Sequence, residues 1–167
     1  EIGMTICKNC ALNTFLLDDG EDVETHDRIS DCLNCRTGKF SPVGSRYCDG
    51  CQAGTRLSVS TLKVSKCDPC RAGKFQADAD QKLCSDCPKG YSQNVIGQPY
   101  CLPCVPGNYQ DENGTDICKK CGAGKFQETS ATISCINCKR GMYQRKKGES
   151  LCLVCIPGKY QNIAGAK

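Results

Sequence analysis

The sequence has very little from which to build an apolar core. Its 167 residues include no tryptophan, two methionines, four phenylalanines and six tyrosines. A globular domain of this length normally buries a large apolar interior. The sequence also has a single histidine, His26, so a histidine-based metal site or a Ser-His-Asp triad is very hard to assemble. With no Gly-rich phosphate loop and no paired-carboxylate motif, we expect neither enzymatic activity nor a cofactor.

Charge is mixed and apolar residues are scattered. The net charge is +4, and no lysine or arginine run carries interleaved aromatics, so we expect no nucleic-acid partner. The densest basic stretch, residues 144–148, is predicted to be a solvated loop. No apolar run of about 18 residues is present, so this segment should not span a membrane. The chain also begins without a leader and ends partway through a repeat, which suggests an internal piece of a longer chain.

Cysteine is the residue that is present in excess. All 18 cysteines fall in nine Cys-x-x-Cys doublets. The doublets begin at Cys7, Cys32, Cys48, Cys67, Cys84, Cys101, Cys118, Cys135 and Cys152. This density indicates a disulfide scaffold and hence an oxidising compartment, so we expect a chain that is secreted or exposed at the extracellular cell surface.

The doublets mark a tandem repeat. From Cys67 onward the period is 17 residues, and before Cys67 it varies. Counted from the second cysteine of each doublet, position +3 is Gly in eight units and Asn13 in the first, which predicts a left-handed backbone there. Position +5 is aromatic in seven units and +6 is usually Gln; Arg56 replaces the aromatic. We interpret each unit as a short hairpin whose whole core is one aromatic, in contact only with its sequence neighbours.

The predicted fold is small, disulfide-rich and mostly irregular, with short β-hairpins in an elongated rod of tandem modules of about 17 residues. The predicted organisation has four parts. These are a longer first module with an acidic insertion (1–31), irregular modules (32–66), regular repeats (67–155) and the start of a further module (156–167).

Three cysteine pairings compete. Each doublet may close on itself as in thioredoxin-like motifs, but such motifs occur once, in a βαβ context. Adjacent doublets may form zinc sites, which remain the alternative for an intracellular chain. The third pairing joins the second cysteine of one doublet to the first of the next and leaves only Cys7 and Cys155 without partners. Its pairs are Cys10–Cys32, Cys35–Cys48, Cys51–Cys67, Cys70–Cys84, Cys87–Cys101, Cys104–Cys118, Cys121–Cys135 and Cys138–Cys152.

The recurring pattern of two cysteines, Gly, Lys, an aromatic and Gln resembles known extracellular modules. It is similar to the one-disulfide module of tumour necrosis factor receptor cysteine-rich domains. In tandem, "CxxCxxGKFQ" more closely resembles ephrin-receptor-like cysteine-rich repeats. The resemblance implies an extracellular protein, and surface proteins or flagellar appendages of protists are one context for such arrays. It says little about function, because these repeats have many roles.

Candidate sites are few. The acidic loop 18–27 offers Asp18, Asp19, Glu21 and Asp22 as calcium ligands, but the usual calcium-loop pattern is absent, so a solvated insertion is the favoured interpretation. The loop 111–116 is interpreted in the same way. It also contains Asn113 in an Asn-Gly-Thr sequon, at a predicted turn, where we expect glycosylation. For a ligand site the only candidates are Arg46, Tyr47 and Arg56.

Two functions from different classes remain. The first is a structural rod, filament component or spacer at the cell surface, and the second is the ligand-binding ectodomain of a cysteine-rich receptor. The near-identity of the units favours the first. The expected partners are other protein chains of an extracellular assembly, and glycans. The recurring outward positions would be the interface. They are Lys at +4 (Lys39, Lys74, Lys125, Lys159) and Gln at +6 (Gln76, Gln93, Gln110, Gln127, Gln144, Gln161).

Overall fold

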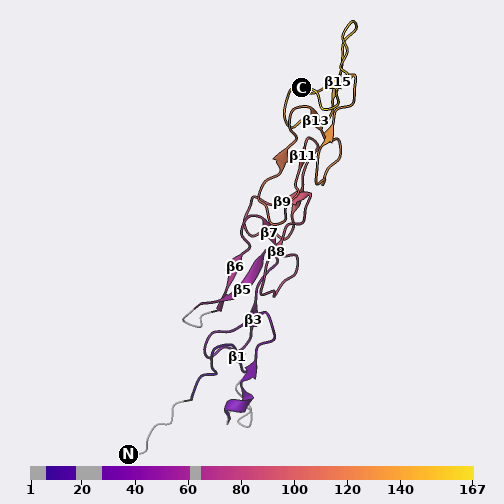
Figure 1. Cartoon of the computed structure of the whole chain (residues 1–167). Helices are drawn as coiled ribbons and strands as arrows, with labels where there is room; N and C mark the ends of the chain where they lie inside the picture. The colour runs from indigo at the N-terminus through magenta and orange to yellow at the C-terminus, as the bar shows by residue number, and fades with distance from the viewer. Residues whose placement is uncertain (1–6, 18–27, 61–64) are drawn as a thin grey trace, which may run out of the picture.

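The described residues form an elongated rod of stacked hairpin modules, with β1 near one end and β15 near the other (Figure 1). In this computed structural model the structure describes residues 7–17, 28–60 and 65–167. We number the modules 1 to 9 by their second cysteines. These are Cys10, Cys35, Cys51, Cys70, Cys87, Cys104, Cys121, Cys138 and Cys155.

Modules 1 to 8 each contain one two-stranded antiparallel sheet, which pairs the strand after the +3 turn with the strand that enters the next doublet. In modules 1 to 3 the pairs are β1 (Thr14–Phe15) with β2 (Leu33–Asn34), β3 (Lys39–Phe40) with β4 (Asp49–Gly50), and β5 (Thr55–Val59) with β6 (Ser65–Pro69). A single 3-10 turn, η2 (Ile29–Asp31), precedes β2.

The regular modules repeat one hairpin with strands of two residues. The pairs are β7 (Lys74–Phe75) with β8 (Ser85–Asp86), β9 (Tyr91–Ser92) with β10 (Leu102–Pro103), β11 (Asn108–Tyr109) with β12 (Lys119–Lys120), β13 (Lys125–Phe126) with β14 (Ile136–Asn137), and β15 (Met142–Tyr143) with β16 (Leu153–Val154). Isolated hairpins of this size are marginal in water. Short hairpins in a disulfide-rich rod are the predicted fold class, which is therefore confirmed.

The left-handed turn at +3 is also confirmed. Every +3 residue has positive φ, from 64° at Asn13 to 85° at Gly107. The +10 turn behaves in the same way in the modules with the 17-residue period, and it keeps positive φ even where glycine is replaced, at Asp80 (60°) and Ala131 (58°). Fold geometry, not residue type, therefore sets the conformation at +10.

The core is not the one that the sequence predicted. None of the +5 aromatics is fully buried, and Tyr160 is 86% exposed. The buried side chains are instead seven of the nine second cysteines together with the +6 glutamines of modules 4 to 8, and Cys87, Cys121 and Cys138 have no exposed surface. A rod about one hairpin thick has no interior large enough to enclose an aromatic ring, so the disulfide takes that place and the ring lies across the surface.

The described residues include no helix that is both long and apolar enough to cross a bilayer.

Candidate functional site along the stacked modules

Eight disulfides hold the modules. They are Cys10–Cys32, Cys35–Cys48, Cys51–Cys67, Cys70–Cys84, Cys87–Cys101, Cys104–Cys118, Cys121–Cys135 and Cys138–Cys152. These are the pairs of the third pairing above, and Cys7 and Cys155 are free thiols. In each regular module the bond closes a loop with a sequence separation of 14 residues. Closing a loop of about that length contributes ~3 kcal/mol by chain entropy.

Backbone hydrogen bonds join successive modules in a fixed pattern. The second cysteine and the +3, +6 and +10 residues all take part. Between modules 4 and 5 the bonds are Gly73 N–H to Gln93 O (2.7 Å), Cys87 N–H to Gly73 O (2.9 Å), Gly97 N–H to Cys70 O (2.8 Å) and Gln76 N–H to Gln98 O (3.3 Å). Equivalent bonds join modules 1 and 2 and every successive pair from module 3 to module 9. At these junctions, main-chain N–H and C=O groups of one module therefore find their hydrogen-bond partners in the next module.

Modules also touch the second module along, which corrects the expectation that each contacts only its sequence neighbours. A β-carbon added to Gly107 in module 6 would lie 2.1 Å from Gly148 O in module 8. The same approach recurs between Gly38 and Asp80, Gly54 and Gly97, Gly73 and Gly114, Gly90 and Ala131, and Gly124 and Gly165. The +3 glycine is thus required twice: for its positive φ, and because a carbonyl two modules away occupies the space of a side chain.

The +6 glutamines are buried plugs rather than outward contacts, which corrects the interface expectation for this position. Gln110 is 1% exposed; its Nε2 donates to Ile117 O at 2.8 Å, and its Oε1 accepts from Glu112 N–H at 3.1 Å. Both bonds lie within one module, so the amide ties the returning strand to the turn. The same pair of bonds forms at Gln76, Gln93, Gln127 and Gln144.

The recurring lysines at +4 divide into two kinds. Lys39 pairs with Asp80 at 3.5 Å, two modules along, and Lys74 pairs with Asp86 across its own hairpin. Lys125 and Lys159 are exposed and make no ion pair with the described residues. A +4 lysine without an ion pair therefore recurs in only part of the described rod.

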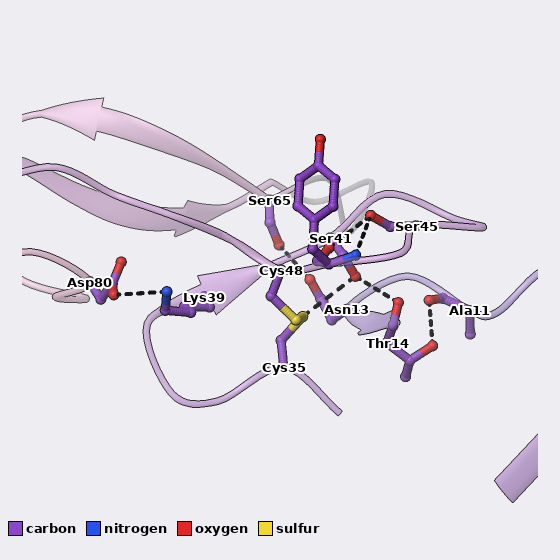
Figure 2. Close-up of a disulfide and its surroundings, with 11 residues drawn as sticks. Ala11, Asn13, Thr14, Cys35, Lys39, Ser41, Ser45, Cys48, Ser65 and Asp80 are labelled. Carbon is purple, nitrogen blue, oxygen red and sulfur yellow. Dashed lines mark hydrogen bonds and ion pairs between the residues drawn. A yellow bond between two sulfur atoms is a disulfide. The ribbon is translucent and has the colours of Figure 1, made fainter. Parts of the chain in front are cut away.

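In the early modules, other polar side chains take over the role of the glutamines (Figure 2). Ser41 stands at +6 of module 2 with no exposed surface, and its hydroxyl donates to Thr14 O in module 1 at 2.7 Å. The Ser65 hydroxyl donates to Asn13 Oδ1 at 3.3 Å and so connects module 3 to module 1. These contacts run between modules, whereas each glutamine bonds within its own.

Arg56 is the sequence departure that the structure places at a groove. A groove of 580 Å³ is lined by Arg56, Asp68, Pro69, Arg71, Lys74, Leu83, Cys84 and Ile96, which belong to modules 3, 4 and 5. Arg56 lies on β5 directly opposite Asp68 on β6. The other two candidates, Arg46 and Tyr47, are not among the lining residues. Sequence reasoning named Lys74 only as a recurring interface lysine and missed Arg71, Leu83 and Ile96 as lining residues, although the loss of the aromatic at Arg56 marks the place.

Five acidic side chains of the described residues form ion pairs with lysines: Asp68, Asp80, Asp86, Asp111 and Glu112. Lys119 Nζ lies 2.7 Å from Asp111 Oδ1 and 2.5 Å from Glu112 Oε1. The hydrogen bond from Lys119 lowers the pKa of Asp111, and the two carboxylates raise the pKa of Lys119. Over residues 7–17, 28–60 and 65–167 no group of three or more His, Cys, Asp or Glu is placed to hold a metal ion. The calcium candidates Asp18, Asp19, Glu21 and Asp22, and His26, lie outside the described residues.

The sequon asparagine lies on the surface. Asn113 is exposed at the +9 position, and its Oδ1 accepts from Lys89 N–H at 3.0 Å. The Thr115 hydroxyl is buried and has no partner in the described part of the chain. Glycosylation of Asn113 stays a prediction.

The repeat geometry agrees with a comparison against known families. The family model described as tyrosine-protein kinase ephrin type A/B receptor-like matches residues 58–97 and 124–167, together half of the chain. This chain belongs to that ephrin-receptor-like family. Ephrin-receptor-like cysteine-rich repeats are typical of extracellular domains, and the repeat family is not catalytic. No curated protein matches the chain.

Proposed function

We propose that this chain is a non-enzymatic structural rod of the extracellular space, a spacer or filament segment at the cell surface. The observation that carries the proposal is the backbone hydrogen-bond pattern, which is the same at each junction from module 3 to module 9. An identical junction fixes the same rotation and rise each time, so the modules extend in one direction.

Contacts between alternate modules support a stiff rod over a flexible string. Bending at one junction would drive a +3 glycine into the +10 carbonyl two modules along, because these groups are already in close contact. Modules 1 to 8 are also closed by a disulfide, and in modules 2 and 4 to 8 a buried +6 side chain is hydrogen-bonded as well, so these modules have little internal freedom. A spacer needs this combination of fixed length and resistance to bending.

Exposed apolar side chains support the proposal that other protein chains of an assembly pack against the rod, and glycans remain a second expected partner. The residues that flank the first cysteine of a doublet point away from the disulfide, because side chains alternate along a strand. In modules 4 to 8 many of these are large and apolar and are between 48% and 72% exposed: Leu83, Tyr100, Leu102, Ile117, Ile136, Leu151 and Leu153.

Deletion in register tests the rod directly. Removing residues 102–118 joins Cys101 to Lys119 and deletes one whole module with its disulfide; removing residues 102–135 deletes two. Small-angle X-ray scattering should show the maximum dimension falling by one fixed step and then by twice that step, with an unchanged cross-section.

Sedimentation of the parent chain supplies the second measurement. Concentration-dependent association would favour a filament segment, and a monomer at all concentrations would favour a spacer. A cross-section that grows on deletion, or a dimension that does not fall in equal steps, would overturn the rod. The groove at Arg56 lies outside the deleted residues, so its properties are tested separately.

A further inference from the structure

The groove at modules 3 to 5 carries an inference beyond the rod. It is built where the irregular part of the chain meets the regular part: β5 and β6 run for five residues each, and the first regular hairpin, β7–β8, lies beside them (Figure 1). Its volume of 580 Å³ lies within the range of about 300–1,000 Å³ that is typical of ligand sites.

Positive charge dominates the lining. Three cations, Arg56, Arg71 and Lys74, face one carboxylate, Asp68. That carboxylate already has a partner, because Lys66 Nζ lies 3.0 Å from Asp68 Oδ1, and Lys66 is not part of the lining. Lys74 is likewise held by Asp86. Neither arginine forms an ion pair within the described part of the chain, although Arg56 faces Asp68 across the hairpin and attracts it electrostatically, so the lining keeps a net positive charge.

Arginine sets the chemistry of what is recognised. A guanidinium group is a planar fork of N–H donors that matches a carboxylate with two parallel hydrogen bonds. Arg56 stands at the +5 position, where seven other modules have an aromatic residue, and Arg71 directly follows the second cysteine of module 4. Lys74 is the lysine that recurs at +4, so the combination arises from one departure, Arg56 in module 3, beside Arg71 and Lys74 of the first regular module.

The rest of the lining is apolar and decides between two kinds of anion. Pro69, Leu83 and Ile96 complete the wall, and Leu83 is 72% exposed. A sulfated glycan has no apolar side chains to cover these residues, and Asp68 would repel its high charge density. A peptide that carries both carboxylates and apolar side chains matches the arginines and the apolar wall together.

We propose that this groove binds an acidic peptide segment of a partner protein, with Arg56 and Arg71 holding its carboxylates and Leu83 and Ile96 covering its apolar side chains. The inference rests on the groove and holds whether the chain is a spacer or a filament segment.

Fluorescence anisotropy with the full oxidised chain tests the proposal. The probe is a fluorescein-labelled decapeptide of alternating leucine and glutamate. It should bind at about 0.1 M salt and more weakly at about 1 M, where the Debye length falls from ~10 Å to ~3 Å. The double variant Arg56→Gln/Arg71→Gln should bind about tenfold more weakly or worse, because each substitution removes a charge-assisted hydrogen-bonded pair with the peptide.

A matched variant separates the groove from net charge. Arg36 and Arg140 are exposed arginines outside the lining, so Arg36→Gln/Arg140→Gln removes the same charge and should change the affinity less than about twofold. The variant Arg56→Lys/Arg71→Lys keeps the charge but loses the fork geometry, and it should bind with intermediate affinity. Leu83→Ser/Ile96→Ser should weaken the leucine–glutamate probe but not a polyglutamate probe. Circular dichroism verifies that each variant is folded.

Each other outcome overturns the proposal. Equal losses in the two arginine-to-glutamine variants would show attraction to net charge alone. Tighter binding of a heparin-type sulfated oligosaccharide, insensitive to Leu83→Ser/Ile96→Ser, would make the groove a glycan site. Absence of binding by the decapeptide at low salt would show that the groove does not recognise acidic peptides.

Discussion

The irregular modules 1 to 3 and the regular modules 4 to 8 solve the same packing problem with different residues. The disulfides of the early modules span 22, 13 and 16 residues, whereas each regular one spans 14. At +6 the early modules have Leu16, Ser41 and Leu57, and the regular ones have Gln. Yet the second cysteine and the positive φ at +3 are shared, and the same main-chain bonds join modules 1 and 2 and each successive pair from module 3 to module 9. The backbone junction is therefore the conserved element of this architecture, and side chains and loops vary around it.

The same contrast bears on the proposed binding groove. In the regular modules the glutamines at +6 bond within their own module. In module 3 the hairpin is longer and the aromatic is replaced by Arg56, and the groove forms there. The proposed site therefore lies where the chain departs from the repeat.

The largest expected effect comes from removing a disulfide inside the regular region. Cys104→Ala/Cys118→Ala should cost about 2–5 kcal/mol and should split thermal unfolding into two transitions, because module 6 connects two halves of the stack. The Cys10–Cys32 disulfide closes a longer loop but lies at one end of the rod. Cys10→Ala/Cys32→Ala should therefore fray module 1 and leave one main unfolding transition. Calorimetry distinguishes the two. A single transition in both variants would mean that the junctions do not depend on the modules they join.

A glycine series separates the two demands on +3. Gly122 has no positive φ and open space around it, Gly141 has φ of +80° and open space, and Gly107 has φ of +85° and a carbonyl 2.1 Å from the added β-carbon. Replacement by Ala should be nearly neutral at Gly122, cost about 1–2 kcal/mol at Gly141, and cost several kcal/mol more at Gly107.

The measurement is urea unfolding of the full chain with disulfides intact. Asn tolerates positive φ. Gly141→Asn should therefore be much less destabilising than Gly141→Val, whereas Gly107→Asn and Gly107→Val should both be strongly destabilising. The sequence predicted the positive φ at +3, and the structure adds the carbonyl contact as a second demand. Equal losses in the free energy of unfolding for Gly107→Ala and Gly141→Ala would show that the contact between alternate modules does not contribute to stability.

These results show what the sequence could and could not predict. The spacing of the doublets and the Gly or Asn at +3 predicted the hairpins and the left-handed turn, because both are local. The contact between Gly107 and Gly148 was not predictable, since a period of 17 residues does not state how far each module rotates on the last. The prediction of an aromatic core was wrong for a related reason. The hydrophobicity of the +5 residues alone does not reveal that the rod is too thin to enclose a ring.

The glutamine plug had a sequence signal that was misread. Gln recurs at +6 next to a strand, and a strand position faces either water or the interior. Only the structure shows that the amide bonds the turn and the returning strand of its own module. Periodic polar residues in thin repeats therefore deserve an internal interpretation before an interfacial one.

Breaking the plug should have an intermediate effect. Gln110→Met keeps the volume but leaves Ile117 C=O and Glu112 N–H without their partner, at a cost of about 1–3 kcal/mol. Gln81→Met is the control, because its only side-chain bond is exposed, and it should be close to neutral. Ser41→Ala should resemble Gln110→Met, because it leaves Thr14 C=O unpaired at a buried position. Hydrogen exchange of the Glu112 amide gives a local readout, and unchanged protection in Gln110→Met would contradict the plug.

The smallest effects concern two surface ion pairs, one in each region. In module 6 the pKa of Asp111 is lowered chiefly by its hydrogen bond from Lys119. In module 3 the pKa of Asp68 is lowered first by a hydrogen bond from Ser58 and only then by Lys66. Lys119→Gln should therefore return the pKa of Asp111 toward its ordinary value of 3.8, whereas Lys66→Gln should leave that of Asp68 clearly lowered.

Carboxyl titration by NMR measures both shifts in the same chain. Because the folded pKa of each aspartate lies below its unfolded value, the stabilisation is present above the ordinary value of 3.8 and is lost as pH falls through the lowered folded pKa. The difference in melting temperature between the parent chain and Lys119→Gln should accordingly be small at neutral pH and should shrink further in that acidic window. If Lys66→Gln instead restored the pKa of Asp68 fully, Ser58 would have no part in holding that carboxylate, and the two regions would treat their surface acids alike.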